Sequence, residues 1–199
     1  MSRPVAVVRT GSANLASVLA ALRRAGAAAQ VTEDPGVVRA ARRVVLPGVG
    51  AFGAVMPRLA ACGIAEALRE RLDDGRPLLA ICLGMQLLAA GSEESPGVGG
   101  VGAIAGAARR FPASVRVPQL GWNRVTPGEG GGLLREGCAY FANSFYLGSV
   151  GDGWVPALAS HGVTFVAAAE RGPQLLCQFH PELSGSWGAD LLDRWMDRC

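Results

Sequence analysis

Three side chains in this sequence have the types and the spacing of a nucleophilic catalytic site: Cys82, His180 and Glu182. A thiolate nucleophile needs a neighbouring base that shuttles protons, and the chain has only two histidines, His161 and His180. Glu182 follows His180 by two residues, and in an extended segment residues i and i+2 point the same way. The carboxylate could therefore hold the imidazole, giving a Cys-His-Glu triad defined by geometry rather than chain order.

The context of Cys82 supports this interpretation. The apolar run 77–81 is followed at once by Cys-Leu-Gly and a helical pattern, which predicts a nucleophile elbow between strand and helix. The helix N-terminus favours the thiolate, the backbone N–H of Leu83 points to where an oxyanion would form, and Gly84 leaves room for the turn. Considered alone, Cys82 could equally be a buried core thiol, as many free cysteines are.

A Gly-rich turn, PGVGAFG at residues 47–53, follows another apolar strand. Such turns present bare backbone N–H groups, so Val49 or Gly50 could supply a second oxyanion donor beside Leu83. The alternatives are a phosphate-binding turn or a plain tight turn. No Gly-Lys-Ser/Thr follows, so a nucleotide P-loop is not indicated. His161, in Ser-His-Gly, is interpreted as a turn residue, whereas the His-Pro-Glu context of His180 favours catalysis over a core or surface role.

The elements that must position these residues alternate in the first half of the chain. Apolar runs predict strands at residues 4–8, 30–32, 43–46 and 77–81. Helical patterns separate them: one starts at an N-cap on Ser12 or Asn14 and ends at Gly26, and another spans 54–74 with a break near Gly63. This β-α-β-α-β-α order predicts a mostly parallel central sheet with helices on both faces.

The second half, beyond Gly91, is richer in glycine and in short runs. We expect short antiparallel strands at 115–117, 123–126 and 138–142, and a final pair at 164–169 and 175–179. A closing helix at 186–198 would place Trp187, Leu191, Leu192 and Trp195 on one face. No segment resembles a linker, so residues 1–199 are expected to form a single domain of α/β class.

Composition excludes several function classes. The chain has 199 residues, 50% of them hydrophobic, and a formal net charge of +3 without a basic cluster, so nucleic-acid binding is not indicated. No apolar run is long enough for a membrane span. Five irregularly spaced cysteines, without a Cys-x-x-Cys pair, indicate neither a disulfide framework nor a metal site. We expect a cytoplasmic protein that uses no metal and no cofactor.

Taken together, ICLGMQ (81–86), QFHPE (178–182) and the PGVG turn resemble the class I, or triad, glutamine amidotransferases. The resemblance covers nearly the whole chain. It implies a flavodoxin-like fold and a glutaminase reaction, in which Cys82 attacks the glutamine carboxamide and His180 protonates the departing ammonia. Gln86 resembles the family's glutamine-binding residue, and Ser144 and Phe145 resemble part of the substrate wall.

Within that family, further segments resemble the glutaminase subunits of imidazole glycerol phosphate synthases. These segments are GSANLASV (11–18), LPGVGAF (46–52), VPQLGWN (117–123), YFANSFY (140–146) and FHPELSG (179–185). The resemblance implies a heterodimer with a cyclase subunit that is a (β/α)₈ barrel. The cyclase would use the ammonia to make imidazole glycerol phosphate and a purine precursor in histidine biosynthesis. Asn14 would face this partner near the ammonia exit.

The sequence departs from the family pattern at three places. Arg9-Thr10 replaces the usual Asp-Tyr, Asn143 stands in place of a His, and Leu183 in place of a Lys. Three other functions remain open: the glutaminase of pyridoxal phosphate synthase, a stand-alone cysteine hydrolase, and a catalytically silent binding subunit. We also expect glutamine hydrolysis to be weak until the cyclase binds, because an oxyanion donor on a Gly-rich turn can be misoriented at low energetic cost.

Overall fold

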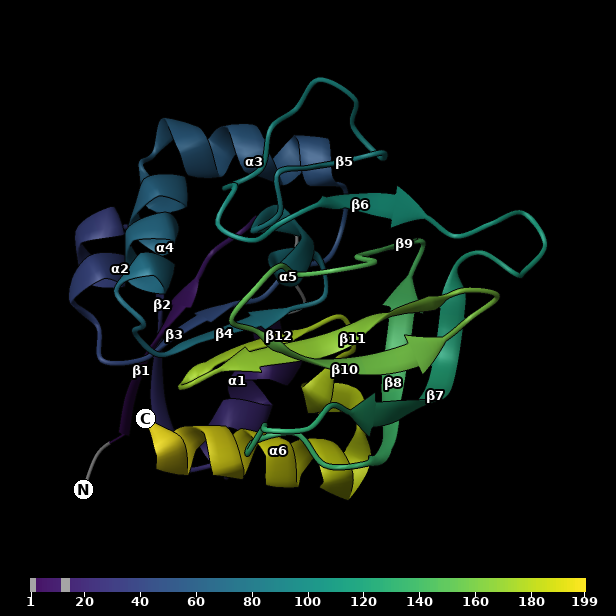
Figure 1. Ribbon diagram of the computed structural model, residues 1–199. Helices are drawn as coiled ribbons and strands as arrows, with labels where there is room; N and C mark the ends of the chain where they lie inside the picture. The colour runs from purple at the N-terminus through teal and green to yellow at the C-terminus, as the bar shows by residue number, and fades with distance from the viewer. Residues whose placement is uncertain (1–2, 12–14) are drawn as a thin grey trace.

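The computed structural model describes residues 3–11 and 15–199, and in this part of the chain a large mixed sheet forms the centre of the molecule (Figure 1). Its parallel half contains, in spatial order, β2 (Ala27–Thr32), β1 (Arg3–Val8), β3 (Val44–Leu46), β4 (Leu78–Ile81) and β12 (Gln174–Cys177). Its antiparallel half continues with β11 (Thr164–Arg171), β10 (Val155–Ser160), β7 (Gln119–Pro127) and β8 (Gly137–Asn143). A small second sheet contains β5 (Gly91–Ser92), β6 (Ala107–Arg110) and β9 (Phe145–Tyr146).

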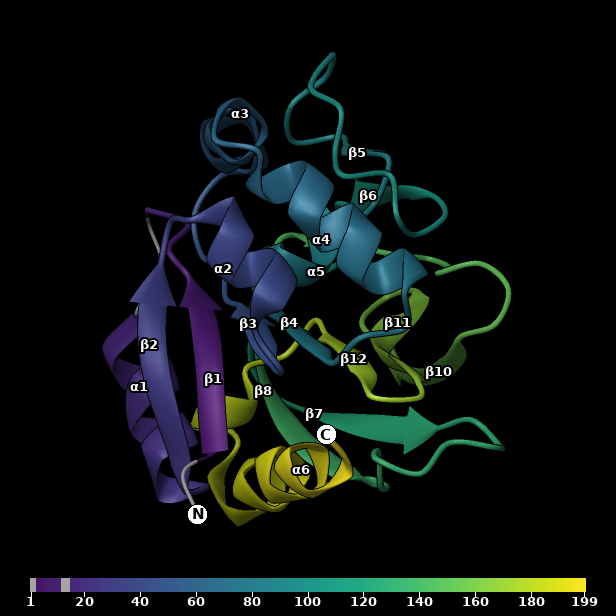
Figure 2. The same ribbon diagram turned by 90° about the vertical axis from the view of Figure 1, so that its left-hand side faces the viewer.

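Helices cover both faces of the parallel half (Figure 2). On one face lie α1 (Leu15–Arg24) and α6 (Gly185–Arg198). On the other lie α2 (Pro35–Ala40), α3 (Phe52–Ala61), α4 (Ile64–Asp73) and α5 (Leu83–Leu87). A short 3-10 turn, η1 (Pro181–Leu183), precedes α6. Because β3 and β4 are buried on both faces, every residue in them is apolar rather than alternating with polar residues.

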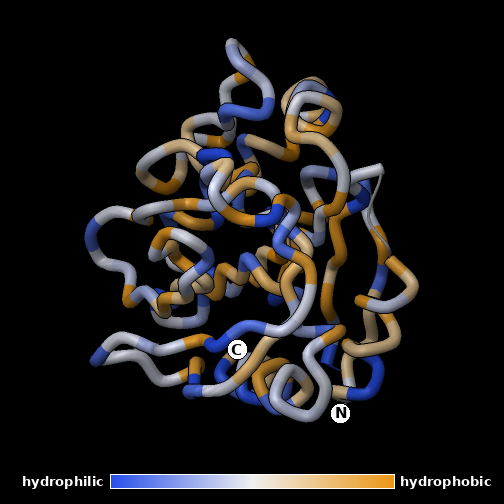
Figure 3. The backbone as a smooth tube through the Cα atoms, turned by 90° about the vertical axis from the view of Figure 1, so that its right-hand side faces the viewer, coloured by the Kyte–Doolittle hydropathy of each residue, from blue (hydrophilic) through white to orange (hydrophobic). Residues whose placement is uncertain are grey.

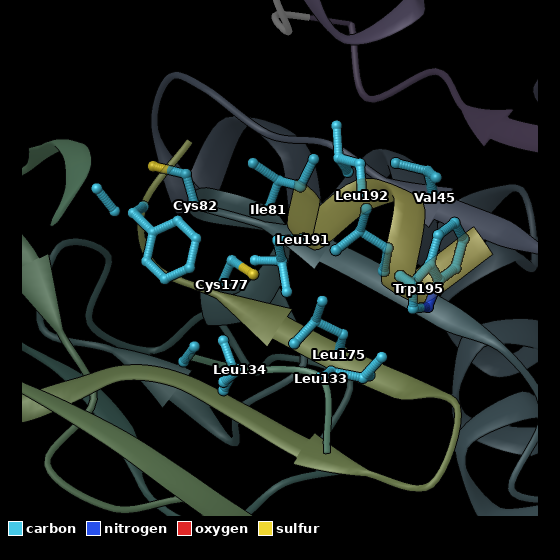
Figure 4. Close-up of a cluster of buried hydrophobic side chains, with 14 of the residues drawn as sticks. Val45, Ile81, Cys82, Leu133, Leu134, Leu175, Cys177, Leu191, Leu192 and Trp195 are labelled. Atoms are coloured by element: carbon cyan, nitrogen blue, oxygen red, sulfur yellow. The ribbon is translucent and has the colours of Figure 1, made fainter. Parts of the chain in front are cut away.

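Two hydrophobic cores result, one on each face of the sheet. The first joins α1 and α6 to the sheet, and Figure 4 shows Leu191, Leu192 and Trp195 of α6 packing near Ile81 and Val45. The second core packs helices α2, α3, α4 and α5 against the opposite face of the sheet. Figure 3 shows hydrophobic stretches along the interior strands and many hydrophilic residues in the outer loops. The cores pack against β4 and β12, and the candidate catalytic residues follow the carboxyl ends of these two strands.

The structure confirms the predicted parallel sheet and the antiparallel pair β11–β12. The helical region 54–74 is two helices, α3 and α4, separated where Gly63 adopts a left-handed φ of 75°. Gly26 ends the turn after α1 with a positive φ of 77°. The two candidate N-caps of α1, Ser12 and Asn14, lie outside the described residues.

Two local predictions are wrong. Residues 115–117 form bends in a loop rather than a strand, because this segment has no strand partner and pairing of β7 with β8 begins at Gln119. The strand predicted at 175–179 ends at Cys177, and the segment after His180 forms the η1 turn instead of extended chain, since Pro181 suits the first position of a helical turn. Among the described residues, no helix has the length and apolarity needed to cross a bilayer.

Candidate active site

Cys82 lies in a strained turn between β4 and α5. Its φ and ψ are 53° and −112°, and it is the only non-glycine residue with a positive φ in the described part of the chain. Such conformations cost on the order of 1–3 kcal/mol and persist where the surrounding structure imposes them. Gly84 makes the turn possible, because a Cβ there would lie 2.1 Å from the Leu46 carbonyl oxygen. Figure 4 shows the Cys82 sulfur directed away from the apolar cluster around Leu191.

The register between β4 and β12 brings the distal residues to this turn. The two strands are parallel, with Ile81 paired to Cys177, so Cys82 and Gln178 follow side by side. The Cys82 N–H donates to the Cys177 carbonyl at 2.6 Å, which fixes the elbow to β12. His180 lies two residues beyond Gln178, and its N–H donates to the Tyr140 carbonyl of β8 at 2.9 Å. Both strand ends therefore place their side chains at the same edge of the sheet.

His180 and Glu182 form a buried hydrogen-bonded pair. The imidazole Nδ1 lies 2.8 Å from Glu182 Oε1, and each side chain is only 6% exposed. The η1 turn, rather than an extended segment, directs the carboxylate back to the ring. Burial alone lowers the pKa of His180, but hydrogen bonds to Cys82 and Glu182 and the charges of both outweigh it, raising the pKa to about 10. The pair therefore favours an imidazolium next to the sulfur.

A cavity of about 280 Å³ opens in front of Cys82 and His180. All the residues that the sequence predicted as oxyanion donors or substrate contacts line it: Val49, Gly50, Leu83, Gln86, Ser144 and Phe145. Ala142, Asn143 and Glu94 complete the wall. This volume is near the lower end of the range for small-molecule sites. Asn14, predicted to face a partner, lies outside the described residues.

The candidate oxyanion donors lie on two segments, the start of α5 and the turn after β3. The Leu83 N–H donates to the Gly48 carbonyl at 3.3 Å, so in this conformation it is used within the protein. Val49 and Gly50 lie on the cavity wall, in the turn between β3 and α3. The turn packs tightly, since a Cβ on Gly48 would come within 2.6 Å of the Gly84 backbone nitrogen.

Two buried or cavity-lining polar residues had no assigned role in the sequence analysis. Glu94 lines the cavity and accepts from the Phe52 N–H at 2.6 Å, which caps α3. The Gln178 amide is fully buried and donates to the Cys82 sulfur at 3.8 Å. Gln178 precedes His180 by two residues in QFHPE, and in an extended segment side chains two residues apart point the same way. This spacing could have identified Gln178 from the sequence. The position of Glu94 depends on a loop whose path no local pattern indicated.

Other chemistry-bearing residues lie apart from this cavity. His161 Nε2 lies 2.8 Å from the Arg116 carbonyl oxygen, and its ring packs edge-on against Phe111, which supports the interpretation as a turn residue. The five cysteines are all free thiols. Within residues 3–11 and 15–199, no cluster of His, Cys, Asp and Glu has the arrangement of a metal site.

This geometry suits acyl transfer through a thioester. A strained elbow presents a thiol next to a His-Glu pair that can carry a proton to a leaving group. The cavity at this site accommodates a small polar substrate and contains one acidic side chain, Glu94, among the residues that line it. Val49 and Gly50 of the turn 47–53 line the same cavity, beside the atoms on which negative charge would develop.

Comparison with known proteins agrees with this chemistry. The curated relatives include imidazole glycerol phosphate synthase subunit HisH of Moorella thermoacetica, 41% identical over 96% of this chain and 92% of the relative. The same subunit of Methanothermobacter thermautotrophicus is 43% identical over 97% of this chain and 98% of its own length. The chain also aligns with 34% of the Arabidopsis thaliana imidazole glycerol phosphate synthase hisHF, at 37% identity.

Solved structures show the same fold. A structure described as a glutamine amidotransferase superimposes with a TM-score of 0.76 at 22% identity, over 96% of both chains. The structure of PurLQS from Thermotoga maritima gives a TM-score of 0.72 at 15% identity, over 99% of both chains. The family model for glutamine amidotransferase class-I matches residues 7–198. The chain therefore belongs to the class-I glutamine amidotransferase family.

Proposed function

We propose that this chain hydrolyses glutamine to glutamate and ammonia and supplies the ammonia to imidazole glycerol phosphate synthase in histidine biosynthesis. The observation that carries the proposal is the Cys82 elbow facing the buried His180–Glu182 pair in a family of glutamine amidotransferases. Relatives named as subunits of that synthase, at about 40% identity over nearly the whole chain, support the pathway. The enzyme is a glutaminase subunit.

In the first half of the reaction, the Cys82 sulfur attacks the carboxamide carbon of glutamine. The tetrahedral intermediate carries an oxyanion, which the backbone N–H groups of Leu83 and of Val49 or Gly50 stabilise. The imidazolium of His180 then gives its proton to the departing nitrogen. The C–N bond breaks, ammonia leaves, and a glutamyl thioester remains on Cys82.

In the second half, water hydrolyses the thioester. His180, now neutral, takes a proton from the water as the oxygen attacks the thioester carbon. The C–S bond breaks, glutamate leaves and the Cys82 thiolate is restored next to an imidazolium. Glu182 holds the ring through Nδ1 in both halves and stabilises its positive charge, without itself accepting the proton.

The cavity wall supports recognition of glutamine itself. Glu94 is the one acidic residue among the described residues that line the cavity, and it suits the α-ammonium group of the substrate. Ser144 and Phe145 line the same cavity. Gln86 lines the same cavity, and its side-chain nitrogen already donates to the Phe145 carbonyl at 2.9 Å. Gln86 therefore contributes to binding partly by fixing the wall against which glutamine lies.

The partner is the cyclase subunit of the synthase, a (β/α)₈ barrel in a heterodimer. The most exposed large apolar side chains of this chain include Leu120, Trp122 and Leu183, and Leu183 also lines a mostly apolar cavity of about 180 Å³ behind His180. Exposed apolar surface next to an active site is typical of a protein–protein interface. This second cavity shares Val49, Ala142 and His180 with the cavity in front of Cys82, which supports it as the route by which ammonia leaves toward the partner.

Glutamine hydrolysis is weak until the cyclase binds. The hydrogen bond from the Leu83 N–H to the Gly48 carbonyl supports this, because it occupies one oxyanion donor. Gly48, Val49 and Leu183 line the same cavity, so a partner docked on Leu183 lies close to the turn. The test is glutaminase turnover with and without the cyclase and its ligand. Equal rates in both conditions would disprove this regulation.

The whole chain forms one glutamine amidotransferase domain, residues 1–199. The match over residues 7–198 and the sheet built from strands at both ends of the chain support a single unit. The setting is the cytoplasm, since five free thiols suit a reducing compartment.

The Cys82→Ser variant tests the triad. Assayed together with the cyclase, it should lose glutamine-dependent synthesis by several orders of magnitude and keep synthesis from added ammonia. Cys138→Ser, at an exposed cysteine, is the matched control and should retain both activities. Glutamine-dependent activity in Cys82→Ser close to that of Cys138→Ser would refute the assignment of the nucleophile.

A further inference from the structure

A buried line of hydrogen bonds leads from a backbone carbonyl to the Cys82 sulfur. The Gln86 side-chain nitrogen donates to the Phe145 carbonyl oxygen at 2.9 Å and to Gln178 Oε1 at 2.9 Å. The Gln178 side-chain nitrogen donates to Cys82 Sγ at 3.8 Å, within the range for hydrogen bonds to sulfur. Gln86 is 4% exposed and Gln178 is fully buried, so water does not compete for these groups.

The direction of every donor in this line is fixed by its first member. A backbone carbonyl can only accept, so the Phe145 oxygen requires the NH₂ group of Gln86 to face it. The same NH₂ group then faces Gln178, which must present its oxygen. The NH₂ group of Gln178 is left pointing at the sulfur. Asn143 also donates to the Phe145 oxygen, at 3.0 Å, and so helps to hold this acceptor in place.

We propose that Gln178 is a further catalytic residue, whose amide N–H donates to the Cys82 sulfur and stabilises the thiolate, with Gln86 as the positioning residue that fixes its orientation. This rests on the proposed function, in which Cys82 is the nucleophile. A thiolate is a stronger acceptor than a thiol, so a donor held in a buried site favours the ionised form. A backbone group also lies near the sulfur: the Ala142 carbonyl, at 3.9 Å, can only accept and favours the thiol.

Gln178 differs from the other influences on Cys82. The titratable groups around the sulfur are His180, Glu182 hydrogen-bonded to it, Glu94 on the wall of the same cavity and Cys177 at the end of β12. His180 changes its charge during the reaction as it gives and takes a proton. The amide of Gln178 has no charge to lose, so it favours the thiolate before attack and again when the thioester breaks.

The test is the pH dependence of Cys82 alkylation by iodoacetamide, followed by mass spectrometry of the peptide that contains Cys82. Gln178→Met keeps the length of the side chain and removes the donor. The midpoint of the alkylation rate should rise by about one pH unit, and the rate below both midpoints should fall by about tenfold. All four titratable neighbours stay in place, so the shift reports on the amide.

Gln174→Met is the matched control. Gln174 is also a fully buried glutamine, but it lies at the start of β12, away from Cys82, and its side chain donates to the Leu72 carbonyl at 2.8 Å. Its loss should lower stability and leave the alkylation midpoint unchanged. An unshifted midpoint in Gln178→Met, or equal shifts in Gln178→Met and Gln174→Met, would overturn the proposal.

A second variant covers the case in which Gln178→Met does not fold. Gln86→Met leaves the Gln178 amide in place but removes the group that orients it, so the midpoint should rise by a smaller amount. If Gln86→Met folds and alkylates like the unaltered protein, the proposal fails. Alkylation needs neither the cyclase nor glutamine turnover. These results therefore decide the role of Gln178, whereas the Cys82→Ser assay decides the proposed function separately.

Discussion

Replacing Glu182 by Gln removes one charge from the catalytic pair and little else. The amide oxygen of the new side chain can still accept a hydrogen bond from Nδ1 of His180, so the ring keeps its tautomer and its orientation. The carboxylate is 2.8 Å from Nδ1, and both side chains are almost fully buried. The electrostatic effect is therefore weakly screened, and it should appear in the titration of His180.

The direction and size of the shift follow from the structure. The pKa of His180 is raised to about 10, with burial opposing the shift and Cys82 and Glu182 producing it. Loss of an adjacent opposite charge lowers a pKa by about 1–3 units. Since the imidazolium protonates the departing ammonia, activity is lost as the pH rises through the pKa of His180. The alkaline limb of kcat/KM should move to lower pH by about 1–3 units in Glu182→Gln.

The assay is glutaminase kcat/KM from pH 6 to pH 10.5 in the complex with the cyclase. A shift of two units in the alkaline limb would lower the rate at pH 9 by about tenfold relative to the unaltered enzyme. Glu136→Gln is the control, because that carboxylate pairs with Arg124 on the surface and should leave the profile unchanged. An alkaline limb in Glu182→Gln that coincides with that of Glu136→Gln would refute the role of the charge.

Three further predictions concern the elbow, the substrate and the partner. Gly84→Ala would put a Cβ about 2.1 Å from the Leu46 carbonyl oxygen and should lower the melting temperature markedly, whereas Gly99→Ala, with no heavy atom within 4 Å, should not. Glu94→Gln should raise the KM for glutamine at least tenfold and change kcat less, as measured by steady-state kinetics. Leu183→Asp should weaken cyclase binding by about tenfold or more in calorimetry, because the side chain is exposed beside the active site and apolar at the interface.

Much of the catalytic site could be predicted because it depends on two strand ends. An apolar run followed at once by Cys-Leu-Gly indicates a strand, a sharp turn and a helix, and the structure has β4, Cys82 and α5 in that order. The second apolar run leads to His180 in the same way. Since both strands are parallel members of one sheet, their carboxyl ends must lie at one edge. Local pattern and sheet topology together therefore placed Cys82 near His180.

The parts that escaped prediction depend on contacts that leave no local pattern. The loop that holds Glu94 follows α5 and folds back onto the start of α3, where it caps the Phe52 N–H. No spacing in the sequence specifies that return path. The loop at 115–117 has the β-branched residues of a strand, but propensity cannot supply the missing pairing partner. The turn at Pro181 showed that a correct contact, His180 to Glu182, can arise from a different backbone path than the one expected.

The site divides into a fixed part and an adjustable part. Cys82 and His180 are held by backbone hydrogen bonds to Cys177 and Tyr140, so their separation is set by the pairing of β4 with β12 and by the contact of the chain after β12 with β8. The oxyanion donors depend instead on the turn after β3, where the Gly48 carbonyl accepts from the Leu83 N–H. Rearranging one turn costs far less than changing the register of a sheet. A partner can therefore change the rate of glutamine hydrolysis through this turn while the nucleophile and its base stay in place.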